Sequence, residues 1–130
     1  METLTKILLV GAGGALGANA RYWLQGWLID RFSAGVWSTF VINVTGSIVI
    51  GLFMGLSLEL NWNPAWRLLL AIGLLGGYTT YSSFAYEAVG LLSNREYLKA
   101  LLYIEGTAVL TILGAWLGLV VARVILGGRV

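Results

Sequence analysis

The chain has 130 residues, of which 58% are hydrophobic and only 11% are charged, and its formal net charge is +2. A soluble domain carries about 25% charged residues, so this composition excludes an ordinary soluble fold. The chain has no cysteine and no histidine, which excludes disulfides, imidazole acid–base catalysis and zinc sites built from these ligands. Its few charges are spread along the chain, so it offers no basic patch for nucleic acid.

Charged residues divide the chain into four long apolar stretches. Residues 32–58 and 68–86, for example, contain no charged side chain. A helix that crosses a bilayer needs roughly 20 mostly apolar residues. The sequence therefore predicts an all-α membrane protein, with residues 1–130 forming a single four-helix transmembrane domain in a lipid bilayer. The predicted spans are Lys6 to Ile29, Trp37 to Leu58, Trp66 to Leu92 and Tyr97 to Ile125.

The first span contains a glycine-rich run, Gly11 to Gly17, directly after the apolar residues 7–10. This order is similar to the phosphate-binding loop of a dinucleotide-binding fold. That fold also needs further strands and charged outer helices, which the rest of the sequence does not offer. We therefore interpret the run as a face of small residues for helix packing, like Gly51 and Gly55 in the second span.

Arg21 is the one charge in the interior of the first span. A cation at that depth costs at least ~2.5 kcal/mol by insertion scales, so its presence needs an explanation. One explanation is structural: the guanidinium reaches the nearer interface or pairs with backbone carbonyls. The other is functional: its positive field attracts anions.

Polar side chains also occur inside the second and fourth spans. Asn43 stands in otherwise apolar sequence, where its amide can join helices or donate hydrogen bonds into the interior. Tyr103, Thr107 and Thr111 recur every four residues, which places their hydroxyls on one face of a helix. Glu105 lies within the same span. A polar stripe is unfavourable against lipid, so this face is expected to meet protein or a water-filled path.

The third span changes character in its middle, where Gly76 and Gly77 are followed by a run of hydroxyl and aromatic residues that ends at Glu87. Such a run weakens a helix, and we expect a break in mid-membrane over residues 76–79. Non-helical backbone at this depth must be buried in protein or line a cavity, and its carbonyls can bind a cation. A simple glycine kink is the alternative.

Lysine and arginine normally orient a membrane protein, because they are enriched on the cytoplasmic side. Here they are nearly balanced. The side of the two termini has Lys6, Arg67 and Arg129, with Arg123 near it, and the other side has Arg31, Arg95 and Lys99. The balance predicts insertion in both orientations, which would allow two opposite copies to pair in the membrane.

Together these motifs resemble the CrcB or Fluc fluoride channels of bacteria over essentially the whole chain. The resemblance is carried by Gly14 to Gly17 before Arg21, by Ser38 to Asn43, and by GGYTTYSSF followed by Glu87. It implies a passive, selective channel in the bacterial inner membrane that exports fluoride from the cytoplasm, and not an enzyme. It also implies an antiparallel homodimer with two pores and a central structural sodium ion, with no nucleic acid or other protein partner.

The resemblance assigns roles to individual residues. Asn43 would donate to fluoride, and Tyr81 and Phe84 would occupy the two pore-lining phenylalanine positions, although Tyr81 departs from the usual phenylalanine. The backbone carbonyls of Gly76 and Thr79, from both subunits, would hold the sodium ion. The other implied pore residues are Tyr103, Thr107 and Thr111 as a polar track, Ser82, Ser83 and Glu87 beside the pore, and Arg21.

Two other functions fit parts of the sequence. A small multidrug exporter is also compact and has four spans, and exchanges protons for cations at a buried carboxylate. That acid belongs in the first span, where this chain has Arg21, so only Glu105 supports the exporter hypothesis. A non-transporting packing protein would explain the glycines but not the polar stripe.

Overall fold

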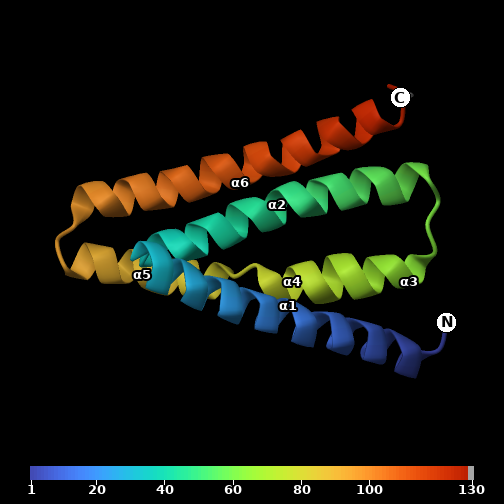
Figure 1. Cartoon of the computed structure of the whole chain (residues 1–130), viewed down its shortest axis with the longest axis horizontal. Coiled ribbons are helices and arrows are strands. Elements are labelled where there is room, and N and C mark those ends of the chain that lie inside the picture. Colours follow the sequence, from blue (N-terminus) through green and yellow to red (C-terminus); the bar gives the residue numbers. More distant parts are fainter. Residues whose placement is uncertain (129–130) are drawn as a thin grey trace.

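A computed structural model describes residues 1–128, which form helices and short connections and no strand. Figure 1 shows four long helical segments joined by short loops. The helices are α1 (Thr3–Phe32), α2 (Val36–Glu59), α3 (Pro64–Trp66), η1 (Arg67–Leu75), α4 (Gly76–Tyr78), α5 (Tyr81–Ser93) and α6 (Tyr97–Ile125). Because α3 to α5 follow one another as a single bent segment, the prediction of four helices is confirmed. Arg129, counted above on the side of the termini, lies outside the described residues.

Three segments are long and apolar enough to cross a membrane, namely α2, Pro64–Ser93 and α6. The 30-residue α1 is not one of them, since Asn19, Arg21 and Gln25 make it more polar. In the most apolar stretch of each span, only 17% to 28% of the residues are buried within the single chain. Helices that are apolar on all sides are typical of membrane spans, where lipid or another protein covers the outer surface.

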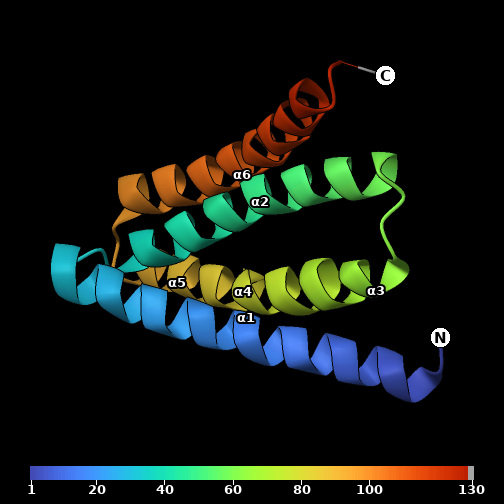
Figure 2. The same cartoon turned by 45° about the vertical axis from the view of Figure 1, so that its right-hand side comes forward.

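The segments pack as two helix pairs, α1 against η1 and α4, and α2 against α6 (Figures 1 and 2). α1 begins and α6 ends at one end of the bundle, together with the α2–α3 connection. We call this the terminus end. The α1–α2 and α5–α6 connections lie at the opposite end. Because the four segments alternate in direction, the first begins and the last ends at the same end of the bundle.

Glycines bring the paired helices into backbone contact. A Cβ atom on Gly17 would overlap the Leu74 carbonyl oxygen, and one on Gly13 would overlap that of Leu69. On the other pair, a Cβ atom on Gly51 would overlap the Ala115 carbonyl oxygen. The glycine-rich run of the first span is therefore a helix-packing face, as interpreted, and it lies in a helix that follows no strand.

The break in the third segment lies slightly later than the sequence predicted. Gly76 and Gly77 are helical, and the extended residues are Thr79, with ψ 158°, and Thr80, with φ −149°. The physical reason lies in the side chains around the break. The Thr80 hydroxyl caps the new helix α5 by accepting from the Ser83 amide, and Asn43 on α2 binds the Thr80 backbone.

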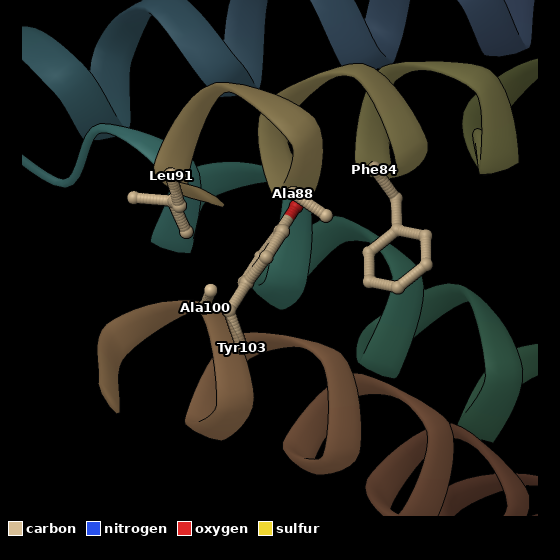
Figure 3. Close-up of a cluster of buried hydrophobic side chains, with 5 residues drawn as sticks. All are labelled: Phe84, Ala88, Leu91, Ala100 and Tyr103. Carbon is tan, nitrogen blue, oxygen red and sulfur yellow. The ribbon is translucent and has the colours of Figure 1, made fainter. Parts of the chain in front are cut away.

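The buried apolar core lies between α5 and α6 near the opposite end of the bundle. Figure 3 shows its members, Phe84, Ala88, Leu91, Ala100 and Tyr103, which project from the two helices toward one another. Tyr103 is the largest fully buried side chain. This core fixes α5 beyond the break and so positions the residues described next.

Candidate functional site

A cavity of about 430 Å³ lies beside the break, between α2, the third segment and α6. Seven of the residues predicted for the site line it: Asn43, Gly76, Thr79, Tyr81, Phe84, Thr107 and Thr111. They come from segments far apart in sequence. The fold therefore brings together the predicted aromatic, amide and hydroxyl positions of the site.

The Asn43 side chain holds the break open. Its Nδ2 donates to the Thr80 carbonyl at 2.9 Å, and its Oδ1 accepts from the Thr80 amide, also at 2.9 Å. The residue is buried, with 8% of its surface exposed. Asn43 is thus the helix-joining residue considered above. Because an amide has two N–H bonds, one donor remains for a ligand in the cavity.

The same side-chain contacts free two backbone carbonyls. In a continuous helix the Gly76 carbonyl would accept from the Thr80 amide, and the Thr79 carbonyl from the Ser83 amide. Here the first amide donates to Asn43 and the second donates to the Thr80 hydroxyl. The two carbonyls predicted as cation ligands have therefore lost their helical partners.

Arg21 lies beside the break and outside the cavity lining. Its Nε donates to the Gly77 carbonyl at 3.2 Å, and the side chain is half-buried. In a continuous helix this carbonyl would accept from the Tyr81 amide, so Arg21 satisfies another group freed by the break. Of the two explanations for Arg21, the geometry favours pairing with backbone carbonyls.

Aromatic rings form one wall of the cavity. Phe84 is buried and lies between two rings, with its centroid 5.4 Å from that of Tyr81 and 5.3 Å from that of Tyr103. Tyr81, by contrast, is 80% exposed, and its hydroxyl makes no hydrogen bond within residues 1–128. The Tyr81 ring therefore lines the cavity on a side that the described residues leave open.

The predicted polar stripe on α6 is present, but its hydroxyls already have acceptors. Thr107 donates to the Tyr103 carbonyl at 2.6 Å, and Thr111 donates to the Thr107 carbonyl at 2.7 Å. Both reach the cavity, whereas Tyr103 lies outside its lining. To donate to an anion, each threonine hydroxyl must rotate away from its carbonyl.

Glu87 belongs to a separate polar network outside this cavity. Its two carboxylate oxygens accept from the Thr39 hydroxyl at 2.8 Å and from the Tyr103 hydroxyl at 2.5 Å. Gln25 on α1 donates in turn to Thr39 at 3.2 Å. Glu87 also lines a second cavity of about 490 Å³ at the opposite end of the bundle, and Glu96 and Lys99 line it too.

The remaining predicted residues lie at the edge of these features. The Thr80 hydroxyl donates to the Ser83 hydroxyl at 3.1 Å. The hydroxyl of Ser82, an exposed residue, lies 3.4 Å from the Thr80 hydroxyl. Both serines help to form the cap of α5 and line neither cavity. Glu105 is exposed on α6 and makes no hydrogen bond or ion pair within residues 1–128.

Sequence reasoning assigned no role to three residues that matter in the structure. Thr80 caps α5 and receives Asn43, and Gln25 and Thr39 extend the network of Glu87. Thr39 lies within the motif Ser38 to Asn43, and Gln25 is one of the few polar residues in the first span. Each was visible as a polar residue within a span, but its partner lies on another helix.

The sequence is similar to known proteins over most of its length. The family described as CrcB-like protein, Camphor Resistance (CrcB) matches residues 8–119. A relative from a strain of Thermus thermophilus is 48% identical over 114 residues, which cover 87% of this chain and 90% of the relative. A relative from Acidobacterium capsulatum is 42% identical, with 91% and 96% covered, and one from Sulfurihydrogenibium is 40% identical, with 94% and 100% covered.

Each of these three relatives is named a fluoride-specific ion channel, FluC. The family match covers most of the chain, and the similarity spans nearly the full length of the relatives. The chain therefore belongs to the CrcB family.

Proposed function

We propose that this protein is a passive channel that exports fluoride across the bacterial inner membrane. The observation that carries the proposal is the cavity beside the break, which is lined by the amide of Asn43, by four threonines and by the aromatic residues Tyr81 and Phe84. The relatives are named as fluoride-specific channels, and channels are not enzymes. For this activity α1 forms a fourth span beside the three apolar ones.

The chemistry of the cavity suits a small, strongly hydrated anion. A pore for such an ion must replace the water around it with hydrogen-bond donors. These donors must bind strongly enough for the ion to enter and weakly enough for it to leave. The free N–H of Asn43 and the rotating hydroxyls of Thr107 and Thr111 are such donors. The ring edges of Tyr81 and Phe84 carry positive quadrupole charge and complete the set.

The pore in this proposal needs a second copy of the chain. Tyr81 lines the cavity and yet is 80% exposed, so one wall is missing in the single chain. A second copy inserted in the opposite orientation would close the cavity of the first, and the first would close the cavity of the second. The antiparallel homodimer would then have two pores. The nearly balanced lysine and arginine residues at the two ends of the bundle support dual insertion.

A structural sodium ion fits the backbone of the break. Unwound carbonyls within a membrane are typical ligands of sodium, and the carbonyls of Gly76 and Thr79 have lost their helical partners. Gly76 also faces the cavity, where a side chain would meet only the Ala71 carbonyl oxygen at 3.9 Å. Equivalent carbonyls from a second copy would complete the coordination, so the ion would stabilise the dimer.

The proposal is tested by anion flux from liposomes that contain the purified protein. We expect rapid release of fluoride and negligible release of chloride, without a proton gradient. Equal release of both anions, or release of neither, would contradict the fluoride channel. Release that requires a proton gradient and an organic cation would instead support the small multidrug exporter.

A further inference from the structure

The network around Glu87 begins with Gln25, a half-buried residue on α1. Its Nε2 donates to the hydroxyl of Thr39 on α2, which is completely buried, and this hydroxyl donates to Glu87 on α5. Tyr103 on α6 donates to the other carboxylate oxygen. Four helical segments thus converge on one carboxylate, and α1 contributes only the amide of Gln25.

Thr39 behaves differently from three other threonines of α2 and α6. Thr45, Thr107 and Thr111 each donate to the carbonyl four residues earlier, the usual arrangement for threonine in a helix. For Thr39 that acceptor would be the carbonyl of Gly35, which instead accepts from Ser38. Thr39 is also the one among these four whose hydroxyl oxygen accepts from a side-chain amide.

The amide explains the difference. A hydroxyl has one hydrogen, and Thr39 gives it to Glu87, so it presents a lone pair toward Gln25. The amide N–H of Gln25 satisfies that lone pair, and this bond holds the hydroxyl in its orientation. Without it, the hydroxyl can turn about its C–O bond, so its bond to Glu87 is weakened while the bond from Tyr103 remains.

We propose that Gln25 is a positioning residue, which through Thr39 holds the carboxylate of Glu87 against the protein at the mouth of the second cavity. This inference rests on the proposed fluoride channel. Glu87 lines that cavity, and two hydroxyls hold its carboxylate. In the proposed channel, an anion that passes this end of the bundle would meet more negative charge if the carboxylate were loosened from Thr39. Negative charge beside such a path lowers the local concentration of anions.

Fluoride flux tests the inference with three variants. Gln25→Met keeps the length of the side chain and removes the donor, and the loss of one net hydrogen bond predicts a flux lower by about three- to tenfold. Gln25→Glu offers an acceptor in place of the donor and should lower flux further. Asn19→Ala, another amide on α1 that bonds only its own helix, is the matched control and should conduct normally.

A double variant separates positioning from general packing. In a Thr39→Val background, Gln25→Met should cause no further loss, because the hydroxyl through which Gln25 acts is gone. The inference would be overturned if the double variant lost as much flux as the two single variants together. It would also be overturned if both Gln25 variants conducted like the wild type. Variants are compared only if they elute from size exclusion at the wild-type volume.

Infrared spectroscopy gives a result that does not depend on flux. The carboxylate band of Glu87 is assigned by its loss in Glu87→Gln, and it should shift in Gln25→Met because the hydroxyl of Thr39, one of its two donors, is no longer held in place. An unchanged band would refute the positioning role. If the wild-type protein carries no fluoride, the proposed function fails, and the band alone still decides the role of Gln25.

Discussion

Tyr81 stands where the resemblance to the fluoride channels implies a phenylalanine. Its ring keeps the positive edge, but its hydroxyl makes no hydrogen bond within residues 1–128. A hydrogen bond to a charged group is worth about 1.5–3 kcal/mol, enough to slow release of a bound ion more than tenfold. We therefore expect Tyr81→Phe to conduct fluoride faster, measured as the initial rate of fluoride release from liposomes.

Two variants control this prediction. Phe84→Ile removes the buried ring of the same wall and should conduct far less. Ser82→Ala removes a neighbouring exposed hydroxyl that does not line the cavity, and its flux should stay normal. If Tyr81→Phe and Tyr81→Ile both leave flux unchanged, position 81 does not line the path.

At this scale the sequence predicted the members of the site better than their partners. Asn43, Phe84 and the threonines of α6 stand out as polar or aromatic residues in unusual places of an apolar chain, and the fold does bring them to one cavity. That Asn43 binds Thr80, and that Gln25 reaches Thr39, depends on how helices rotate against one another. No local pattern specifies that rotation.

The helix pairs depend on backbone contacts that only glycine permits, and α1 offers a matched test of this. Gly17 and Gly11 lie on the same helix, but a Cβ atom on Gly17 would clash with Leu74, whereas one on Gly11 would meet nothing within 4 Å. Gly17→Ala should therefore lower the stability by about 1–3 kcal/mol, the usual cost of overpacking. Gly11→Ala should be neutral or slightly stabilising, because alanine favours helix.

Thermal unfolding in detergent measures both effects, and each variant is compared with the wild type at the same detergent concentration. A Tm that falls equally in the two variants would mean that the loss of glycine flexibility, and not the contact with η1, matters. Equal stability in all three proteins would mean that α1 does not pack closely on the third segment.

Among the elements, the four segments were predictable because charges and turn residues interrupt long apolar runs. The turn before the third segment is an example, since Asn63 caps the helix and Pro64 occupies its first position. The π-helical winding of Arg67–Leu75 was not predictable, and neither was the exact place of the break. Both are set by contacts with neighbouring helices: α1 packs on η1, and Asn43 binds Thr80.

At the scale of the whole molecule, three features bear on the proposed dimer. The three apolar spans are mostly exposed, Tyr81 leaves the cavity open, and two carbonyls at the break lack helical partners. In the proposed antiparallel dimer, a second copy would cover part of the spans, close the cavity at Tyr81 and add further carbonyls at the break. A channel of this design requires that one sequence insert in both directions in comparable amounts.

The distribution of charge makes this requirement testable. Within residues 1–128, the terminus end carries Lys6, Arg67 and Arg123, and the opposite end carries Arg31, Arg95 and Lys99. Because lysines added to short loops bias orientation, two extra lysines at one end should fix it. Glu2→Lys with Thr5→Lys adds them at the terminus end, and Ser93→Lys with Asn94→Lys adds them at the opposite end, in each case at exposed positions.

Each double variant expressed alone should insert in one direction, shown by reporters fused to the C-terminus, and should give little fluoride flux because antiparallel pairs cannot form. Expressed together, the two variants should restore flux close to that of the wild type. The unmodified chain should place its C-terminus on both faces of the membrane. A biased variant that conducts normally on its own would show that the active assembly does not require two opposite copies, and would contradict the antiparallel dimer.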